Sequence, residues 1–582
     1  MPIPDLKAEH KLLKNLFFKK WPSLKQIRYL PKILTKREKK IIQILSLVIA
    51  ILIIILIVRL SQTNLKTIPT FGGHHIEGII GQPQYVNPVL AKTNDVDLDL
   101  TKLIFSGLFK YNKNLQLVPD LVKNYEISSD KLTYKFELKD NIFWHNNVPL
   151  SADDILFTIK LVRNPEFNNP WFDYFKNVEI IKNSEKKFEI RLQGPNPNFL
   201  KYLTIGIIPK HIWQDIPVKQ LYLSEYNLKP IGSGPFKFKS LIRDNKGLIK
   251  SYRLERNKNF YDKIPYLDSL TFQFYSNFEN LIAAVRKREA NAVYYAPKNL
   301  EKEFLATDFL KKYTFQLPYF TAIFFNLNTQ NYLSSSTIRR VLAYATPKEK
   351  IINQVLFNEG QIIDGPILPH SFGYNPEIKK YEYNPDKAIK ILENSGWQKN
   401  LDGYWQKNNK ILEISLTTVQ QSDLEKVGEI IQKSWQDLGI KTKLITVPAE
   451  IVQKEIITPR NYQALLYGII ESFESDPYLF WHSSQIKSPG LNLSGFNNKR
   501  VDELLEKAQT IPFDEAKKRK YLEFQNIIAE EVPAIFLYST SYTYLVNKKI
   551  KGITIEKINI PSDRFNGVEN WYIKTKKIRN NK

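Results

Sequence analysis

The 582-residue sequence contains no cysteine, one methionine and seven histidines. Without cysteine the chain can form no disulfide, cannot use thiol catalysis or a cysteine-based metal site, and cannot be tethered by a lipid-modified cysteine. It also lacks Gly-x-Ser-x-Gly and His-Glu-x-x-His, so two common hydrolase signatures are missing. We therefore look first for binding rather than for covalent chemistry.

Two short patterns could suggest a bound ion, and both have simpler explanations. His74 and His75 are adjacent, so they would point to different sides of a helix or strand, and no third ligand follows them. Gly-Ser-Gly at 232–234 lacks the Lys-Ser/Thr and the following helix of a phosphate-binding loop. We interpret it as a tight turn and predict no metal and no cofactor.

The chain is strongly basic, with 84 Lys and Arg against 59 Asp and Glu and a formal charge of +25. Its basic residues are scattered and form no known nucleic-acid module, so we predict no nucleic-acid partner. The apolar share of 43% and charged share of 25% are ordinary for a globular protein. The length exceeds what one hydrophobic core usually supports, which predicts two or more lobes.

One long apolar run stands out, residues 41–58. As a helix it would be about 27 Å long, close to the hydrocarbon thickness of a bilayer. It has no polar face, which argues against a buried core helix. We predict a transmembrane anchor at 41–58, preceded by a basic cytoplasmic segment at 1–40 and followed by a linker at 59–74.

Charge sets the expected orientation of this anchor. Only Arg59 and Lys66 lie close to its far side, so the positive-inside rule puts the N-terminus in the cytoplasm and the rest outside. A cleaved signal peptide is the alternative, but Val58-Arg59-Leu60-Ser61 is a poor cleavage site. The basic residues of the N-terminal flank are Lys7, Lys11, Lys14, Lys19, Lys20, Lys25, Arg28, Lys32, Lys36, Arg37, Lys39 and Lys40.

The region after the anchor begins with an ordered series of patterns. Apolar residues recur at helical spacing within 97–109, and apolar and polar residues alternate over 132–138 as in a half-buried strand. Ser151 and Asp154 stand three apart before an apolar run, which predicts a helix start closed by a capping box.

These patterns fall within a series of motifs that resembles family 5 extracellular solute-binding proteins, the dipeptide-, oligopeptide- and nickel-binding components of ABC importers. Further similar segments continue over residues 75 to 560. The motifs are Gly107-Leu108, Val118-Pro119-Asp120-Leu121, Ser129 to Leu138, Phe143 to His145, Pro149 to Asp154, Gly206 to Trp213 and Pro230 to Phe238.

The later part of the chain predicts a second lobe built from strands and helices. A strand is expected at 319–326, a helix at 337–346, a helix at 384–396 ended by its glycine, and a strand at 440–447. Thr346 with Glu349 predicts a capping box around Pro347, and Ser422 with Glu425 predicts the start of a helix that stops at Gly439. Alternation of helix and strand favours a mixed or parallel sheet.

The resemblance implies an α/β, two-lobed periplasmic-binding-protein-like fold (type II, cluster C) with an extra subdomain in lobe one, in addition to the N-terminal transmembrane helix. We expect lobe one at 75–317, with the subdomain at about 97–225, and lobe two at 318–534. Residues 535–582 should return to lobe one and end in a basic tail.

The resemblance also implies where a ligand binds. In the peptide-binding branch of the family, the strand within 465–485 pairs with the ligand backbone, and an acidic residue three positions before an Asp/Glu-Pro pair holds the ligand's amino group. Here that position is Phe473, so Glu471, Glu474 or Asp476 would have to take the role, unless they are only solvated loop carboxylates. The expected ligand-binding residues are Gln82, Pro83, Tyr319, Tyr467, Gly468, Ile469, Ile470, Glu471, Glu474, Asp476 and Trp481.

The implied function is that of a membrane-anchored, extracytoplasmic and non-enzymatic solute-binding protein of an ABC importer. It would capture peptides or oligopeptides in an interlobe cleft, as a monomer, and deliver them to permease subunits. Nickel chelates, haem and sugars stay open as ligands, because relatives bind them. A cell-wall glycan hydrolase and a non-transporting ligand sensor on the same fold are the alternatives. For Trp481, simple packing competes with a place in the cleft wall.

Overall fold

The computed structural model describes residues 34–63, 65–91, 94–167, 171–196, 198–329, 332–369, 371–470, 476–488, 490–511 and 514–579. The chain divides into two compact units. The larger comprises residues 71–573, and the smaller is formed by the two ends of the chain, residues 1–70 and 574–582.

The smaller unit contains a long helix and a two-stranded ribbon. Helix α4 (Lys36–Thr63) extends beyond the apolar run that the sequence analysis identified, and its Lys36–Leu56 segment is the one stretch of the described residues long and apolar enough to cross a membrane. Thr35 donates to the Glu38 carboxylate from its backbone N–H at 2.8 Å and its hydroxyl at 2.7 Å. Strand β1 (Leu65–Pro69) pairs antiparallel with β22 (Thr575–Arg579), so part of the expected linker is a strand.

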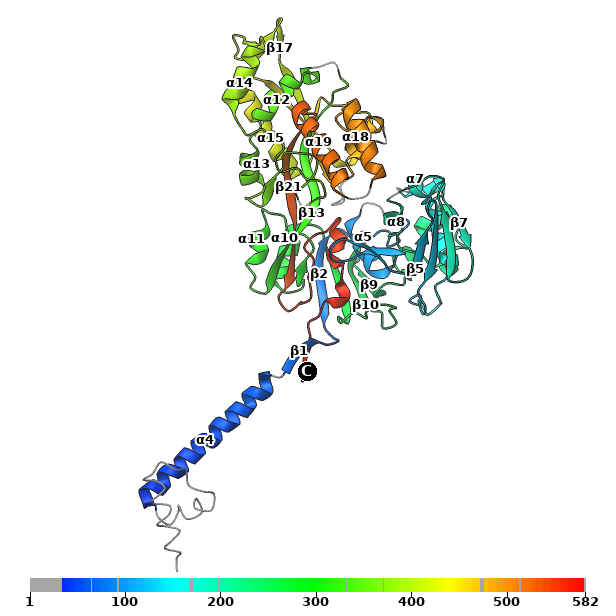
Figure 1. Ribbon diagram of the computed structural model, residues 1–582, viewed down its shortest axis with the longest axis vertical. Coiled ribbons are helices and arrows are strands. Elements are labelled where there is room, and N and C mark those ends of the chain that lie inside the picture. The colour runs from blue at the N-terminus through cyan, green and yellow to red at the C-terminus, as the bar shows by residue number, and fades with distance from the viewer. Residues whose placement is uncertain are drawn as a thin grey trace, which may run out of the picture. The chain divides into compact units, whose positions relative to one another are not determined.

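The larger unit is organised around an 11-stranded sheet of the described residues, and Figure 1 shows its long strands running between an upper and a lower lobe. Both parallel and antiparallel neighbours occur, as the sequence predicts for lobe two. Its strands lie in the order β19 (Lys441–Val447), β18 (Glu413–Val419), β20 (Ala464–Ile470), β13 (Leu310–Phe325), β21 (Ala534–Asn547), β12 (Ala292–Val293), β2 (His74–Ile80), β11 (Ser269–Tyr275), β10 (Ile249–Arg256) and β9 (Phe236–Arg243), with β14 (Gly360–Ile362) paired to β21.

The fold is two-lobed, with a separate hydrophobic core in each half. One core draws its buried side chains from residues 320–538 and the other from residues 79–315 and 542–571, with a smaller cluster around α10 (Phe278–Arg286) and α11 (Glu301–Leu305). Strands β13 and β21 contribute to both cores. Their pairing is interrupted between Gln316 and Phe320, and β14 also pairs with residues 538–540 of β21 at this level, which is the crossing between the lobes.

Helices cover the lobe-two part of the sheet. Helix α15 (Ser422–Asp437) connects the parallel strands β18 and β19, which is the βα-type unit that the sequence predicts. The other helices of this lobe are α12 (Ser336–Tyr344), α13 (Lys348–Val355), α14 (Pro385–Asn394), α16 (Ala449–Val452), α17 (Tyr478–Trp481), α18 (Lys499–Thr510) and α19 (Glu515–Glu531), beside the small sheet β15 (Gln398–Lys399), β16 (Trp405–Lys407) and β17 (Lys410–Ile411).

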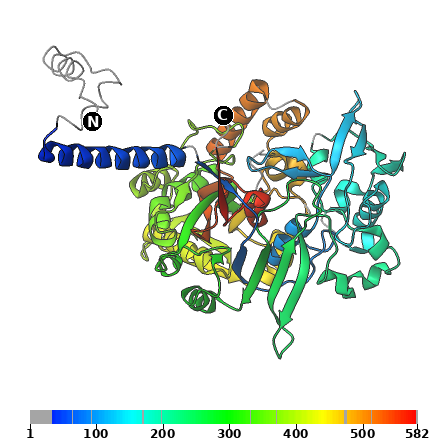
Figure 2. The ribbon, with the colours of Figure 1, turned by 90° about the horizontal axis from the view of Figure 1, so that it is seen from below.

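Lobe one carries an additional four-stranded sheet, seen in cyan to one side of β9 and β10 in Figures 1 and 2. Its strands lie in the order β5 (Val122–Ile127), β6 (Thr133–Leu138), β8 (Lys187–Arg191) and β7 (Glu179–Lys182). Around it lie the hairpin β3 (Phe109–Tyr111) and β4 (Leu117–Pro119) and the helices α5 (Asp95–Ile104), α6 (Ala152–Val162), α7 (Phe172–Phe175), α8 (Phe199–Tyr202) and α9 (Lys210–Trp213).

Several local predictions can be compared with the hydrogen bonds. The capping box of α6 is confirmed, since Ser151 N–H donates to Asp154 at 2.9 Å and Asp153 N–H donates to the Ser151 hydroxyl at 3.3 Å. The start of α14 is capped by Asn384, and Gly396 ends it with φ +78°. In α15 the N-cap position is Gln421, one residue earlier than predicted.

The capping box predicted at Thr346 is wrong. The Thr346 hydroxyl donates to the Leu342 carbonyl at 2.7 Å and accepts from the Trp435 indole N–H at 3.2 Å. Helix α13 therefore begins after Pro347 without a side-chain cap. The Thr346 hydroxyl is already hydrogen-bonded to the preceding helix and to Trp435 in the core, and residue spacing alone does not reveal these partners.

The Gly-Ser-Gly turn permits a close approach of two chain segments. Gly234 N–H donates to the Ile104 carbonyl at 2.7 Å, and a Cβ on Gly232 would lie 2.0 Å from that oxygen. His145 fixes the turn, because Gly232 N–H donates to its Nδ1 at 3.2 Å and its Nε2 contacts the Gly234 carbonyl oxygen at 3.1 Å. Burial lowers the pKa of His145 to about 4, so the imidazole is neutral here.

Candidate ligand-binding cleft

A cavity of about 1500 Å³ lies between the two lobes. Its lining includes residues of α5, α7 and α8 in lobe one and of α18 and α19 in lobe two, and Figure 1 shows where these helices lie. Residues of the segments 106–113 and 559–570, together with residues 194–196 and Asn198, complete the lobe-one side, and Ile470, Asp476 and Leu479 contribute from lobe two. Because its lining comes from both lobes, a ligand held there would touch both.

Helix α5 forms one wall of the cleft, because one of its faces is buried in the core of lobe one and another lines the cavity. Asn94 caps it by accepting from Val96 N–H at 3.0 Å. Leu100 and Leu103 are buried in the core, whereas Leu98, Thr101 and Lys102 lie on the cleft side. Lys102 forms an ion pair at 3.0 Å with Asp563, which lies on the 3-10 turn Pro561–Phe565, so two distant parts of the chain share this wall.

A fully buried arginine holds that turn against α5. The Arg564 guanidinium donates to Glu77 at 2.9 and 2.6 Å and to Asp99 at 2.7 Å, and Tyr544 donates to Glu77 at 2.9 Å. Burial raises the pKa of Asp99 to about 7, an effect that Arg564 only partly offsets. For Glu77, Arg564 and His75 outweigh burial and lower the pKa. A buried ionic network thus stabilises this wall of the cleft.

A second ionic group lies at the rim. Lys110 Nζ is 2.9 Å from both Asp120 and Asp262, and the Tyr261 hydroxyl donates to Asp120 at 2.8 Å. Burial disfavours the charged lysine, but the two carboxylates outweigh it and raise the pKa of Lys110. These charges satisfy one another, so they are weaker candidates for meeting a charged ligand.

Asp476 is the carboxylate that lobe two presents to the cleft among the described residues of 465–485. It is half-buried and accepts from Tyr478 N–H at 3.3 Å. Burial raises its pKa, while the charges of Lys517 and Lys201 act in the opposite direction. Glu471 and Glu474, the other two expected carboxylates, lie outside the described residues.

Strand β20 leaves part of one edge unpaired. Its residues 464–470 all pair with β13, but on the other side only 464–466 pair with β18. No strand of the described residues pairs with that edge of Tyr467, Gly468, Ile469 and Ile470. Such an edge offers backbone donors and acceptors to an extended ligand, and Ile470, which is 52% exposed, lines the cavity.

Tyr319 and Gly468 form an interlocked pair where the lobes meet. A Cβ on Gly468 would lie 2.0 Å from the Tyr319 hydroxyl, so only glycine leaves room for this ring. The Tyr319 hydroxyl also accepts from the Thr321 hydroxyl at 3.3 Å. The structure therefore places both residues beside the unpaired edge, although neither lines the cavity itself.

Two other expected site residues, Gln82 and Pro83, lie in the loop that follows strand β2. Gln82 accepts from Ile249 N–H at 3.3 Å through its side chain, and Pro83 is buried. The Asp97 carboxylate accepts from the N–H groups of Gln84 at 2.8 Å and Tyr85 at 2.9 Å. Neither Gln82 nor Pro83 lines the cavity described here.

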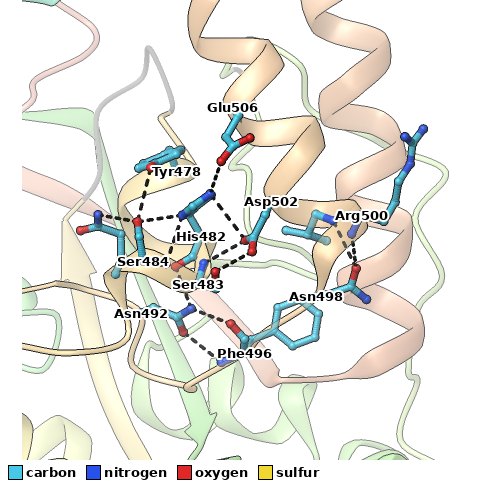
Figure 3. A network of polar contacts seen from close by, with 12 residues as sticks. Tyr478, His482, Ser483, Ser484, Asn492, Phe496, Asn498, Arg500, Asp502 and Glu506 are labelled. Atoms are coloured by element: carbon cyan, nitrogen blue, oxygen red, sulfur yellow. Dashed lines mark hydrogen bonds and ion pairs between the residues drawn. The ribbon is translucent and has the colours of Figure 1, made fainter.

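Trp481 packs in the core of lobe two. It is 2% exposed, and its ring lies 5.8 Å from Phe536 and 6.5 Å from Phe324 between centroids. The prediction that it forms the cleft wall is corrected, because α17 turns this face of the chain inward. His482 is buried between Ser484, at 2.7 Å, and Glu506, at 3.3 Å, and ties this turn to α18 (Figure 3).

Sequence reasoning missed one carboxylate near the lobe junction. Asp423 is half-buried in the first turn of α15, and its charge contributes to raising the pKa of Tyr295, Tyr319 and Tyr538, after burial as the main cause. It therefore lies near these hydroxyls. A signal existed, because Asp423 follows the carboxyl end of a strand in a βα unit, where ligands of α/β folds commonly bind.

Comparison with known proteins adds independent information. The sequence profile described as "Bacterial extracellular solute-binding proteins, family 5 Middle" matches residues 116–488. The oligopeptide-binding protein AppA of Bacillus subtilis (strain 168) is 27% identical over 563 residues, which cover 92% of this chain and 99% of that protein. The dipeptide-binding protein of Escherichia coli (strain K12) is 23% identical over 511 residues, or 82% and 91% of the two chains.

Solved structures are similar over most of the chain. The structure of AppA from Bacillus subtilis in complex with a nonapeptide superposes with a TM-score of 0.70 at 27% identity, covering 87% of this chain and all of that one. NikZ from Campylobacter jejuni in complex with Ni(L-His) gives 0.69 at 27% identity, covering 86% and 99%. Proteins similar to this chain to the same degree thus hold ligands of very different size.

Proposed function

Because the chain belongs to family 5 of the bacterial extracellular solute-binding proteins, we propose that it captures oligopeptides between its lobes and passes them unchanged to an ABC importer. The lobes would close around the ligand by bending at the crossing of β13 and β21, and the closed form would dock on the permease. The proposed cycle involves no covalent step, and we propose that the protein acts as a monomer.

The observation that carries the peptide assignment is the size of the cleft together with its unpaired strand edge. A volume of about 1500 Å³ exceeds the roughly 300–1,000 Å³ that suits a drug-sized ligand. The edge at Tyr467–Ile470 can pair with a peptide backbone whatever its side chains are. Both features favour an extended peptide over a metal chelate or a single sugar.

We propose that Asp476 replaces the acidic residue that the family uses to hold the ligand's amino group. It lines the cleft on the lobe-two side, and burial raises its pKa, so the positive charge of a ligand's amino group would stabilise its ionised form. Asp423 is the second candidate, near the tyrosines at the lobe junction. Glu471 and Glu474 stay candidates on sequence grounds alone.

Anchoring by α4 is part of the proposal. The apolar segment Lys36–Leu56 supports it by length and composition, and the basic excess in residues 1–40 supports a cytoplasmic N-terminus with the binding lobes outside. The anchor would take the place of the missing lipid-modified cysteine and keep the lobes near the permease.

The experiment is native mass spectrometry of the full-length protein released from detergent micelles. A series of adducts whose masses and fragments are those of peptides would support the proposal. Recovery of only a nickel chelate or a sugar would overturn the ligand class. A protein that releases no ligand would next be titrated with a peptide library by calorimetry, and absence of binding at that step would overturn peptide capture.

A further inference from the structure

We propose that the β1–β22 ribbon is a binding surface for anionic phospholipid headgroups of the membrane that holds α4. The inference rests on the proposed anchoring by α4 but concerns a different site from the cleft. The ribbon consists of Leu65–Pro69 and Thr575–Arg579, so it joins the segment directly after the helix to the last strand of the chain.

The pairing of these strands gathers positive charge that is scattered in the sequence. Lys66 pairs with Ile578, Ile68 with Lys576 and Thr67 with Lys577, so basic residues more than 500 positions apart in the chain gather on the same two-stranded ribbon. Lys574 lies one residue before β22, and its carbonyl accepts from Thr70 N–H at 3.0 Å. Alternation of side chains along each strand puts basic residues on both faces of the ribbon.

These lysines are available to an external partner. Lys66, Lys574, Lys576 and Lys577 are all exposed, and none of them forms an ion pair among the described residues. Residues 65–70 and 574–579 contain no Asp or Glu at all. An uncompensated cluster of this kind needs either bulk solvent or a surface of opposite charge.

The length of α4 places the ribbon at the level of headgroups. Its 28 residues span about 42 Å, which matches the roughly 40–45 Å of a bilayer with both headgroup layers rather than the ~30 Å hydrocarbon core alone. Lys66 follows the end of the helix by three residues, so its Cα is at most about 11 Å from that of Thr63. A helix that spans the bilayer therefore delivers these lysines to the phosphate layer.

The position of the ribbon next to the membrane favours anionic lipid over other polyanions as its partner. A basic residue close to an anionic membrane surface favours the bound state about fivefold, and a helix anchor holds the ribbon at that surface permanently. The attraction should fade at high salt, since the screening length falls from about 8 Å at physiological ionic strength to about 3 Å at 1 M.

The test uses the absence of cysteine in the chain. The full-length protein with Thr67→Cys, an exposed ribbon position, is labelled with a fluorophore and reconstituted into vesicles that carry a nitroxide on a fraction of the headgroups. We expect quenching to be about twofold stronger with phosphatidylglycerol than with phosphatidylcholine alone, and the difference to vanish at 1 M salt.

Two quadruple variants distinguish an effect of the ribbon lysines from an effect of the protein's net charge. Lys66→Gln, Lys574→Gln, Lys576→Gln and Lys577→Gln together should abolish the dependence on anionic lipid. The same number of exposed lysines changed elsewhere, Lys380→Gln, Lys390→Gln, Lys433→Gln and Lys443→Gln, should leave it intact.

Each outcome has one meaning. Equal quenching in both lipids by an embedded protein would overturn the ribbon proposal and leave the anchor and the cleft untouched. Loss of lipid dependence in both quadruple variants would also overturn it, because the effect would then follow net charge. Release of the protein by alkaline carbonate would show that α4 is not an anchor, and both proposals about the membrane would fall while peptide capture would still stand on its own test.

Discussion

At the scale of single residues, the Asp97 carboxyl, which binds the loop after Gln82, should make the stability of the protein depend on pH. Burial raises its pKa to about 6, although the N–H groups of Tyr85 and Gln84 favour the ionised form. In the unfolded chain the pKa is about 3.9. The folded state therefore holds the proton more tightly, and the stability that Asp97 contributes below pH 4 is lost as the pH rises through 6.

We therefore expect Asp97→Asn to flatten this part of the pH profile. Relative to the variant, the free energy of unfolding of the wild type should fall by about 2–3 kcal/mol between pH 4 and pH 7. Urea unfolding of both proteins in detergent at several pH values measures it. Profiles that run parallel would show that the carboxyl titrates equally in the folded and unfolded states.

The two carboxylates at the lobe junction can be ranked by a matched pair of substitutions. If Asp476 holds the ligand's amino group, Asp476→Asn should weaken peptide binding about tenfold or more, because a charged hydrogen bond contributes about 1.5–3 kcal/mol. Asp423→Asn should then change it by less than about threefold. Calorimetry with one peptide and its N-acetylated form decides, since only the free amine should distinguish wild type from Asp476→Asn.

At this scale the sequence predicted positions better than contacts. Ser151 and Asp154 meet as predicted because both partners lie within one turn. Thr346 failed because its hydroxyl is taken by residues at Leu342 and Trp435. For Trp481 the sequence left core packing and a place in the cleft wall open, and it packs in the core, because the resemblance does not tell which face of its short helix turns inward.

At the scale of elements, Arg339 connects two helices of lobe two. It is 3% exposed, and its guanidinium donates to the carbonyls of Leu333 at 2.7 Å and Val532 at 3.0 Å as well as to those of Ser334 and Glu531. It therefore joins the start of α12 to the end of α19. Burial lowers its pKa to about 10, which still leaves it charged at neutral pH.

Arg339→Lys should destabilise the protein by about 2–4 kcal/mol, because an ammonium cannot reproduce the planar fork and leaves buried carbonyls without donors. The neighbouring Arg340→Lys, at a half-buried site with no ion pair among the described residues, is the control and should stay within about 0.5 kcal/mol. Thermal unfolding measures both. Equal small effects would show that water or main-chain shifts satisfy these carbonyls.

The element order shows why much of the fold could be predicted and the cleft could not. Helical and strand periodicity is local, so 132–138, 384–396 and 440–447 formed the expected elements. The wall formed by α5 and the 561–565 turn joins residues more than 450 positions apart through Arg564 and Asp99. No spacing rule within one segment could reveal that partnership.

At the scale of the whole two-lobed unit, a charge cluster bridges the crossing strands. Glu359 belongs to lobe two and lies 2.8 Å from Lys312 on the lobe-one half of β13. It also pairs with Lys298, which donates to Thr543 of β21 at 2.7 Å. Lys312 in turn pairs with Glu301 at 2.6 Å. This cluster connects the lobes outside the cleft, so it bears on their relative motion and not on ligand contact.

Glu359→Gln should broaden the distribution of interlobe distances and change peptide affinity at least about twofold, since the open and closed populations set the apparent affinity. Glu413→Gln, which removes a pair with Lys441 within lobe two at 3.0 Å, should do neither. Small-angle scattering and calorimetry on the two variants give the comparison. Indistinguishable behaviour would mean that the cluster does not influence the hinge.

The central claim is that the two lobes close around a peptide, and it can be measured directly as a distance. Glu179→Cys in lobe one and Lys507→Cys in lobe two are both exposed, and the absence of other cysteines makes spin labelling specific. Pulsed electron–electron resonance is recorded on protein freed of ligand and again after addition of a bound peptide. We predict a shorter and narrower distance distribution with peptide. An unchanged distribution at saturating peptide would contradict the account.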